Sequence, residues 1–391
     1  MNILYVPSWF ISKKRPLNGV YFYEQAKALS KICDNLFVIY PKEIEFGKNI
    51  VKNEENIRFF PFLKFHYKRT FFFGFFLKLF IKKIIKRYGK IDLIHAQSFL
   101  WAGIECAKIS KKFNIPLIIT EHHSRFLVVD EKPEIKKLIN EAITIASKVV
   151  FVSSPLRSSF CQKMKLNENE LNDKFLVIPN SVSDVFFQTK GFIQINTSLK
   201  EYFSDNKKFI FISIGNLKPT KGFDILIDAF HNAFSKVDNV KLFIGGDGPL
   251  KFNLIEKITN LKLQNKIILL GQLNREEVEY VLEHSNCFVL ASRFETFGIV
   301  LIEALAKGLP VIATDCGGPK DIVNQDCGIL VKNEDTEALA EAMKKIFFNY
   351  KKYDNKKIKQ FAFENFSETA FIEKYRNLYF KVIEEKNIKT N

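Results

Sequence analysis

The sequence predicts an α/β protein built from two Rossmann-like domains that face a central cleft. Short apolar runs of strand length alternate along the chain with longer runs that have helical periodicity. A polar segment that is poor in strand-forming residues, 191–206, divides this alternation into two halves. At 391 residues the chain is long enough for each half to bury its own core. We therefore expect an N-terminal domain at 1–190, a linker at 191–206 and a C-terminal domain at 207–365.

In the first half, the apolar runs expected to form strands are 2–7, 36–40, 57–61, 91–95, 116–120, 149–153 and 176–180. The loop after the first run contains Gly19 and leads into a helix at 20–31, an arrangement that suits a phosphate or a sugar. An ordinary connection between a strand and a helix is the alternative.

Two histidines follow the run at 116–120, where the end of a strand places them at the edge of the sheet. An imidazole in that position can donate a hydrogen bond to a sugar hydroxyl or to a phosphate. His122 is our candidate and His123 the second choice. A purely structural role is the alternative for either.

In the second half, the expected strands are 209–214, 240–244, 267–270, 287–290 and 309–313, and the chain from Gly328 onward is expected to be helical. Lys221 and Gly222 directly precede a helix at 223–234. An ammonium group at a helix start adds charge to the helix dipole, which suits a diphosphate. Asp247 invites a metal-ligand interpretation, but no second carboxylate is spaced to share the ion, so we interpret it as a turn residue.

The most informative stretch runs from 291 to 321 and surrounds an apolar helix expected at 299–306. Glu303 interrupts that helix, and a buried carboxylate is costly unless it is hydrogen-bonded. Glu295 lies in the loop before the helix, and Gly298 lets the backbone approach a ligand closely. Because helix N-termini attract anions, we expect a phosphate-bearing ligand whose hydroxyls meet the two carboxylates.

The combination of these motifs resembles the retaining glycosyltransferases of the GT-B fold, family 4. The matching features are Glu-Xaa-Phe-Gly at 295–298, the second glutamate at 303, Ala-Xaa-Gly-Xaa-Pro-Val at 306–311 and Gly-Gly-Pro at 317–319. The resemblance covers nearly the whole chain. It implies that a last helix, 366–391, crosses back to the first domain.

The resemblance also implies roles for individual residues. Glu303 would accept the ribose hydroxyls of a nucleotide sugar, Glu295 a hydroxyl of its sugar, and Lys221 would meet the diphosphate. His122 would lie beside the donor sugar, and His122, Lys221 and Glu295 would carry the catalysis. The full set of donor-binding residues implied by the resemblance is Gly19, Asn216, Lys221, Gly246, Leu273, Glu295, Phe297, Gly298, Ile299 and Glu303.

Two positions depart from the family pattern: Ser181, in a hinge turn where the family usually has glycine, and Asn216, which bears on the chemistry. The family commonly has an arginine where this chain has Asn216, and an amide brings no charge to the diphosphate. Neutralisation would then depend more heavily on Lys221 and on helix N-termini. We expect no metal and no cofactor beyond the nucleotide sugar. No nucleophile emerges from the sequence, which is compatible with the same-face substitution with retention of configuration that the resemblance implies.

Composition indicates the class of protein, the kind of partner and the cellular compartment. The chain has a hydrophobic fraction of 47%, which indicates a globular protein, and a formal net charge of +16. That charge suits an acidic partner such as anionic lipid, a nucleotide sugar or nucleic acid, and a solvated basic surface is the alternative. Its start lacks the features of a signal peptide and no run is long enough to span a membrane. The six cysteines form no Cys-Xaa-Xaa-Cys pair, so we expect free thiols in the cytoplasm.

The segment 62–90 has the most unusual composition in the chain. A helix at 75–88 would place apolar residues on one face and five basic residues on the other, next to Phe71, Phe72 and Phe73. This pattern favours peripheral binding to the anionic inner face of the cell membrane. An ordinary helix whose apolar face lies in the core is the alternative.

We therefore expect a glycosyltransferase of hexosyltransferase type that uses a UDP- or GDP-linked sugar and builds a cell-surface polysaccharide. The acceptor would be a glycan or a lipid-linked glycan. A catalytically silent subunit that binds sugar nucleotides or membranes is the second hypothesis, because of Asn216. Binding to nucleic acid is the third and is disfavoured, since the basic residues are scattered and no recognised module is present.

Overall fold

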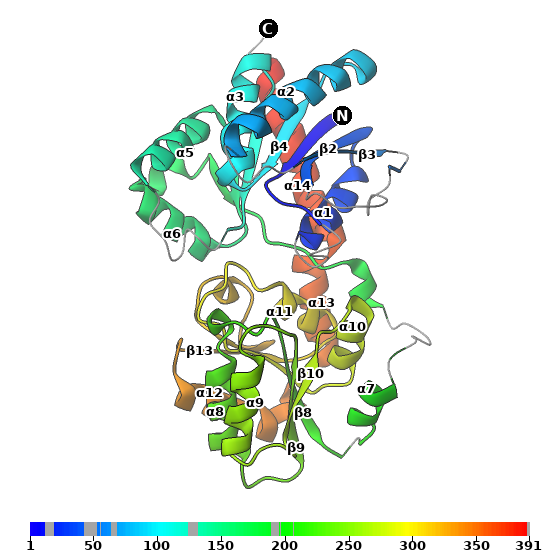
Figure 1. The fold of residues 1–391 in the computed structure, drawn as a ribbon, viewed down its shortest axis with the longest axis vertical. Helices are drawn as coiled ribbons and strands as arrows, with labels where there is room; N and C mark the ends of the chain where they lie inside the picture. The colour runs from blue at the N-terminus through cyan, green and yellow to red at the C-terminus, as the bar shows by residue number, and fades with distance from the viewer. Residues whose placement is uncertain are drawn as a thin grey trace. The chain divides into compact units, whose positions relative to one another are not determined.

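The computed structural model describes residues 1–11, 19–42, 53–54, 56–63, 69–123, 132–188, 195, 197–205 and 207–388. Within these residues the chain forms two parallel β-sheets, each flanked by helices (Figure 1). It divides into two compact units, of which the first comprises 1–179 and 371–391 and the second 180–370. The predicted α/β class with two Rossmann-like sheets is confirmed.

The sheet of the first unit has the strand order β3-β2-β1-β4-β5-β6-β7, and every neighbouring pair is parallel. Its strands are β1 (Asn2–Pro7), β2 (Asn35–Lys42), β3 (Ile57–Leu63), β4 (Leu93–Gln97), β5 (Leu117–Glu121), β6 (Lys148–Phe151) and β7 (Phe175–Val177). Its helices are α1 (Val20–Ser30), α2 (Arg69–Tyr88), α3 (Ile104–Phe113), α5 (Pro133–Ile145) and α6 (Ser154–Met164). The strand order reverses beside β1, where open parallel sheets bind ligands.

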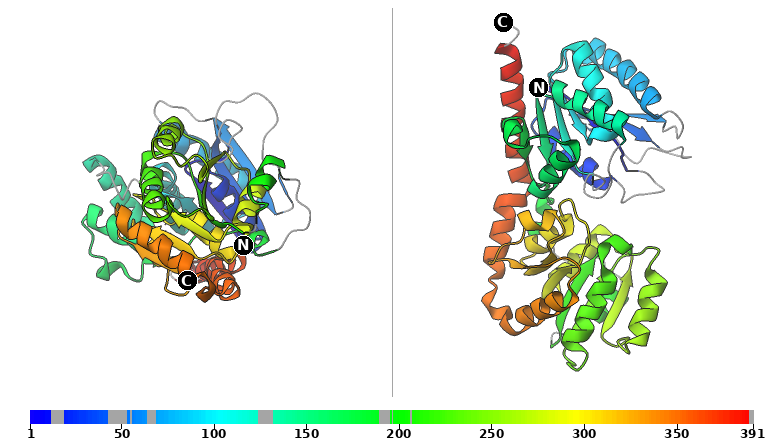
Figure 2. Two further views of the ribbon diagram at one scale, coloured as in Figure 1. Left: turned by 90° about the horizontal axis from the view of Figure 1, so that it is seen from below. Right: turned by 90° about the vertical axis from the view of Figure 1, so that its left-hand side faces the viewer.

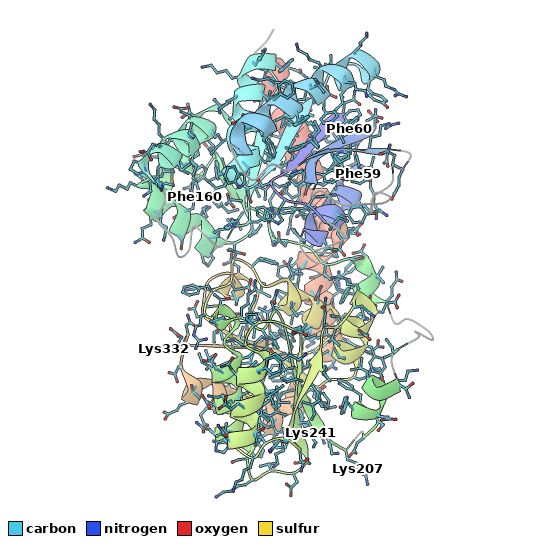
Figure 3. All side chains as sticks on the ribbon, viewed as in Figure 1. Phe59, Phe60, Phe160, Lys207, Lys241 and Lys332 are labelled. Carbon is cyan, nitrogen blue, oxygen red and sulfur yellow. The ribbon has the colours of Figure 1, made fainter. Side chains whose placement is uncertain are left out.

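Helices cover both faces of this first sheet. Successive side chains of a strand point to opposite faces, so neighbouring residues pack against different helices. On β3, Phe59 contacts Tyr23 of α1, whereas its neighbour Phe60 contacts Phe80 of α2 (Figure 3). Apolar residues on both sides of the strands therefore find a helix to pack against.

The last helix, α14 (Glu368–Ile388), packs on the α1 face of the first sheet (Figure 2). Its buried residues recur at helical spacing and are Phe371, Tyr375, Leu378, Tyr379 and Val382. They share one core with β1, β2 and α1. Most of α14 thus belongs to the unit that holds the beginning of the chain.

The sheet of the second unit has the order β10-β9-β8-β11-β12-β13 and is also parallel. Its strands are β8 (Phe209–Ile214), β9 (Val240–Gly245), β10 (Ile267–Gly271), β11 (Cys287–Leu290), β12 (Val311–Thr314) and β13 (Gly328–Val331). Its helices are α7 (Thr197–Tyr202), α8 (Phe223–Phe234), α9 (Lys251–Asn260), α10 (Arg275–Glu283), α11 (Ile299–Ala306), α12 (Thr336–Asn349) and α13 (Asn355–Phe366). The expectation that the chain is only helical after Gly328 was wrong, because 328–331 pairs with β12 as an edge strand.

The boundary between the units also differs from the predicted one. The second unit begins at Asn180 rather than after the expected linker at 191–206. Two hydrogen bonds explain the difference: the Val182 amide donates to the Phe366 carbonyl at 2.9 Å, and the Glu368 amide donates to Asp184 at 2.9 Å. Part of the expected linker forms α7, and 191–194, 196 and 206 lie outside the described residues.

Candidate functional site

In the second unit, the predicted ligand-binding residues follow the carboxyl ends of β8, β9, β10 and β11. The loop after β11 carries Glu295 and is tied to the loop after β12. The Glu295 amide donates to the Cys316 carbonyl at 3.2 Å, and the Gly318 amide donates to the Glu295 carbonyl at 2.8 Å. Two loops that the sequence predicted to matter separately therefore form one edge of the site.

Lys221 and Glu295 form the central contact of this edge. The ammonium nitrogen of Lys221 lies 2.6 Å from Oε2 of Glu295, although the residues are 74 positions apart in sequence. Both side chains are partly accessible, with 28% and 17% of their surfaces exposed. The pair thus places one positive and one negative group where a bound molecule can reach both.

The N-terminus of α11 lies directly after this loop. Gly298 precedes the helix with φ of 105°, a left-handed conformation that L side chains rarely adopt. The glycine has no side chain with which to cap the helix, and the N-terminus of a helix attracts anions through its first backbone N–H groups. A Cβ atom on Gly318 would lie 2.3 Å from Cα of Phe297, which shows how closely the two loops approach.

Glu303 is buried in α11 and has a cationic partner. Its carboxylate accepts a hydrogen bond of 2.7 Å from Nη1 of Arg275, at the start of α10, and Glu303 is only 4% exposed. The Arg275 guanidinium also stacks over the ring of Phe186 at 4.5 Å. The cost of burying this carboxylate, anticipated from the sequence, is offset by a residue that the sequence did not single out.

Arg293 is a second residue that the sequence analysis missed. Its guanidinium binds both carboxylate oxygens of Asp224, at 3.0 and 2.8 Å, and donates to the Pro219 carbonyl at 2.6 Å. Its backbone amide donates to the Thr220 carbonyl at 2.8 Å. These bonds connect the β11 loop with the turn that carries Lys221, so Arg293 fixes Lys221 relative to Glu295.

The other residues predicted for this site lie at the same ends of the strands. Asn216 is exposed after β8. Gly246 after β9 has φ of 137°, and a Cβ there would lie 1.9 Å from the Gly215 carbonyl oxygen, so this position requires glycine. Leu273 is buried against Gly245 and Ile299 begins α11.

In the first unit, Gly19 and His122 lie on elements that touch. Gly19 has φ of 86° at the start of α1, and the α1 residues Tyr21 and Phe22 contact the imidazole of His122 with ring centroids 5.7 and 5.1 Å apart. Nε2 of His122 lies 2.7 Å from Oε1 of Gln97. Burial lowers the pKa of His122 to about 3, so the ring is neutral.

A buried carboxylate holds the backbone around His122. Glu121 accepts hydrogen bonds from the amides of Phe99, His122 and His123 at 2.8, 2.8 and 2.6 Å. Burial raises its pKa to about 7, although these bonds act in the opposite direction. The second-choice residue His123 packs its ring edge-on against Trp9.

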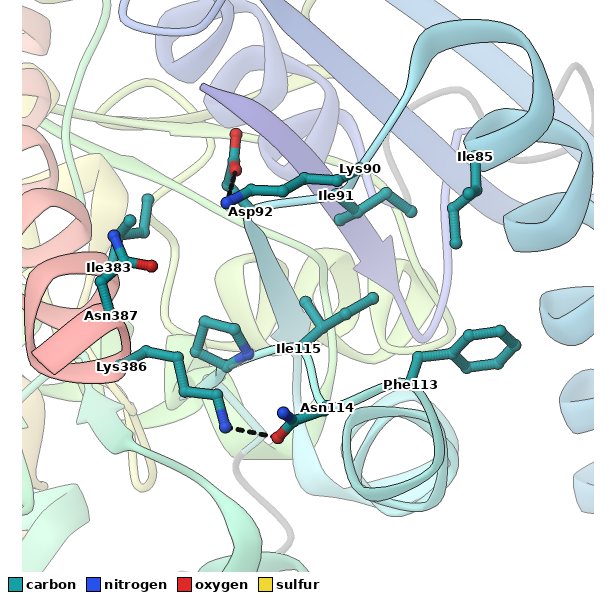
Figure 4. A pocket seen from close by; sticks show the side chains of 11 residues that line it. Ile85, Lys90, Ile91, Asp92, Phe113, Asn114, Ile115, Ile383, Lys386 and Asn387 are labelled. Carbon is teal, nitrogen blue, oxygen red and sulfur yellow. Dashed lines mark hydrogen bonds and ion pairs between the residues drawn. The ribbon is translucent and has the colours of Figure 1, made fainter. Parts of the chain in front are cut away.

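A cavity of about 650 Å³ in the first unit lies apart from all the predicted site residues (Figure 4). It is found where β4 and β5 begin, at the opposite ends of the strands from His122. Its lining residues are Ile85, Lys90, Ile91, Asp92, Phe113, Asn114, Ile115, Pro116, Ile383, Lys386 and Asn387.

Two further observations concern metals and membranes. In the described part of the chain, no three His, Cys, Asp or Glu side chains are grouped so that they could hold a metal ion. Asp247, considered above as a ligand, instead accepts hydrogen bonds from the Gly248 amide at 2.7 Å and from Lys251 at 3.1 Å.

Among the same described residues, none of the helices has the length and apolar character needed to cross a membrane.

Two family models match the chain. A model described as glycosyl transferases group 1 matches residues 194–362, and one described as glycosyltransferase family 4 matches residues 19–185. They correspond to most of the second and first units respectively.

Relatives and a solved structure agree with these models. N-acetyl-alpha-D-glucosaminyl L-malate synthase of Bacillus anthracis is 26% identical over 304 residues, which are 76% of this chain and 77% of the relative. The uncharacterized glycosyltransferase MJ1178 of Methanocaldococcus jannaschii is 31% identical over 273 residues, 68% of either chain. Anabaena HepE, solved in complex with UDP, has the same fold with a TM-score of 0.75 and 20% identity, covering 97% of this chain and 100% of HepE. The chain belongs to the family 4 glycosyltransferases of the GT-B fold and is a glycosyltransferase.

Proposed function

We propose that this glycosyltransferase moves a sugar, with retention of configuration, from a UDP- or GDP-linked donor that the second unit binds. The observation that carries the proposal is the contact of 2.6 Å between Lys221 and Glu295 beside the open N-terminus of α11. A positive group and backbone N–H groups suit a diphosphate, and a carboxylate suits a sugar hydroxyl. UDP is the first nucleotide to test, because HepE was solved with UDP.

The chemistry follows from the charges at this site. As the bond between the sugar and the diphosphate breaks, negative charge grows on the leaving diphosphate. Lys221 and the α11 amides would stabilise that charge, and Glu295 would hold a sugar hydroxyl. The acceptor hydroxyl would attack from the side that the diphosphate leaves, and its proton would pass to the departing phosphate oxygen.

The remaining roles are also proposals. Glu303 would accept the ribose hydroxyls, with Arg275 holding its carboxylate in place at 2.7 Å. His122 and Gly19 of the first unit would contact the sugar and the phosphates. The reaction would need neither a metal nor a separate cofactor, so turnover should persist in excess EDTA.

We further propose that α2 brings the protein to an anionic membrane carrying a lipid-linked acceptor of cell-surface polysaccharide synthesis. Phe75 and Leu79 are 53% and 51% exposed, one helical turn apart. The exposed basic residues beside them are Lys78, Lys82, Lys83, Lys86 and Arg87. Two apolar side chains among positive charges suit the boundary between lipid headgroups and acyl chains.

The structure limits this membrane surface. Leu77, Ile81 and Ile84, which the sequence offered to a membrane, are fully buried in the first unit. The side chains of Phe71 and Phe72 lie outside the described residues. The proposed membrane surface is therefore the basic outer face of α2 with Phe75 and Leu79.

The transferase proposal is tested with a panel of UDP- and GDP-sugars. The purified protein should hydrolyse one donor slowly, and NMR should detect the released sugar first in the anomeric form of the donor. Glu295→Gln, prepared in parallel, should lose this activity and so exclude a contaminant. Donor binding without turnover by any acceptor would favour the silent-subunit alternative, whereas no binding of any nucleotide would contradict the proposal.

A further inference from the structure

A chain of buried hydrogen bonds runs from His122 into the core of the first unit. Nε2 of His122 lies 2.7 Å from Oε1 of Gln97, and Nε2 of Gln97 lies 3.0 Å from Nε2 of His95. Gln97 and His95 are both fully buried on β4. The proposed function uses only the first of these three side chains.

The chain continues to two tyrosines of α14. Nδ1 of His95 lies 2.6 Å from the Tyr379 hydroxyl, and Nε2 of His95 lies 2.7 Å from the Thr120 hydroxyl. The Thr120 hydroxyl in turn lies 3.0 Å from that of Tyr375. Both tyrosines are buried with His95, so α14 closes the inner end of the chain.

The chemistry of Gln97 decides where the protons lie. Its amide nitrogen can only donate, so Nε2 of His95 is an acceptor, shared by Gln97 and by the Thr120 hydroxyl as donors. The His95 proton then lies on Nδ1 and is donated to Tyr379. Its amide oxygen can only accept, so the His122 proton lies on Nε2. Nδ1 of His122 is then left with a lone pair. Burial lowers the pKa of both histidines to about 3, which keeps both rings neutral.

We infer that Gln97 is a positioning residue that holds His122 as the Nε2–H tautomer, so that Nδ1 of His122 accepts a hydrogen bond from a hydroxyl of the transferred sugar. The inference rests on the proposed function, in which His122 meets that sugar. His95 lies against the amide nitrogen of Gln97, and the hydroxyls of Thr120 and Tyr379 hold His95 in place. A histidine without this support would populate both tautomers and offer the acceptor only part of the time.

The test compares Gln97→Leu, Gln97→Glu and the wild type by ¹⁵N NMR of the histidine side chains, with the His122 signal assigned from His122→Asn. Wild-type His122 should be the neutral Nε2–H tautomer at pH 7. Gln97→Leu should give a mixture of tautomers and turnover about tenfold lower, the value of one lost hydrogen bond. Gln97→Glu keeps an acceptor for Nε2–H, so it should keep the tautomer, restore turnover relative to Gln97→Leu and raise the pKa of His122.

Gln25→Leu is the matched control. Gln25 is also a buried glutamine of the first unit, and it bonds to Tyr5 and Tyr21 rather than to His122. This variant should leave the His122 tautomer unchanged. If Gln97→Leu destabilises the first unit, the comparison of Gln97→Glu with the wild type still carries the test.

Two outcomes separate this inference from the proposed function. Full activity of His122→Asn would contradict the role proposed for His122 itself. Impaired His122→Asn together with an unchanged tautomer and unchanged turnover in Gln97→Leu would overturn the role of Gln97 alone. A wild-type proton on Nδ1 of His122 would overturn it as well.

Discussion

At the scale of single residues, the surroundings of Glu303 bear most directly on how a nucleotide is held. Its carboxylate is 4% exposed and is fixed by Arg275 at 2.7 Å. A carboxylate that is already desolvated and oriented can accept hydroxyl hydrogen bonds without first losing side-chain freedom. The buried pair is thus consistent with a preformed acceptor for the ribose.

Glu303→Ala should weaken UDP binding roughly ten- to a hundredfold, since each hydrogen bond to a charged acceptor contributes about 1.5–3 kcal/mol. Isothermal titration calorimetry measures the loss. Glu341→Ala is the control, because Glu341 pairs with Lys344 on an exposed helix face. Equal affinity in the Glu303 variant and the control would make Glu303 a structural acid.

Single residues also show what sequence could and could not predict. Lys221 and Glu295 each stand in a local motif, and the fold brings them together at 2.6 Å. Arg275 and Arg293 stand in no motif, and the chain has 59 lysines and arginines. Only the packing of α10 and of the β11 loop selects these two arginines as the partners of Glu303 and Asp224.

A titration tests the buried groups around β5. The pKa values of His95 and His122 are lowered to about 3 by burial, below the ordinary 6.5, so the unfolded chain binds two more protons as pH falls below 6.5. The pKa of Glu121 is raised to about 7 from 4.5, so folding retains one proton between these values and Glu121 contributes stability that is lost as pH rises. Between pH 5 and 6 the unfolded state therefore binds about one proton more than the folded state.

The first unit should therefore lose stability as the solution is acidified from pH 6 to pH 5. Glu121→Gln removes the opposing proton, so the slope should steepen to about two protons. Urea unfolding followed by tryptophan fluorescence measures it, because both tryptophans of the chain, Trp9 and Trp101, belong to the first unit. If the free energy of unfolding changes with pH equally steeply in the wild type and in Glu121→Gln, the proton count is wrong.

At the scale of elements, short turns set the geometry of the site. Gly222 starts α8 directly after Lys221 with φ of 62°, and a Cβ there would lie 1.9 Å from the Ala291 carbonyl oxygen. Sequence predicted such turns from their glycines. It could not assign the apolar face of α2 to the core, because burial in a core and burial in a membrane demand the same periodicity. It also missed β13, a four-residue strand at the edge of the second sheet.

Gly222→Ala should destabilise the second unit by several kcal/mol more than Gly271→Ala. Both glycines have positive φ, so both variants carry the strain of about 1–2 kcal/mol, but nothing lies within 4 Å of a Cβ on Gly271. Far-UV circular dichroism in urea measures the difference. Equal midpoints would mean that the backbone contact at Ala291 relaxes freely.

Replacing Lys78, Lys82, Lys83 and Lys86 together with Gln should abolish most binding to vesicles that contain anionic lipid. Each lysine near such a surface contributes about 1 kcal/mol, screened over about 10 Å at 0.1 M salt. Cosedimentation measures binding. The control replaces Lys207, Lys332, Lys351 and Lys352 of the second unit, which are also exposed. Similar losses in both variants would indicate a response to net charge rather than a surface on α2.

At the scale of the whole molecule, the first unit is built from two separate segments of the chain, 1–179 and 371–391, and the second from one, 180–370. The fold class and the alternation of strands and helices were predictable because parallel strands and their helices repeat a local pattern. The return of 371–391 to the first unit depends on contacts of α14 with β1 and β2, hundreds of positions earlier in the chain. Composition alone cannot specify such a pairing.

The measurement that most directly tests the central claim, that the second unit holds the donor nucleotide at the start of α11, is hydrogen–deuterium exchange with and without UDP. The donor site described here predicts slower exchange at 216–222, 271–275 and 295–302 in the presence of the nucleotide. Protection confined to 85–92, 113–116 and 383–387, which line the cavity of the first unit, would contradict the claim.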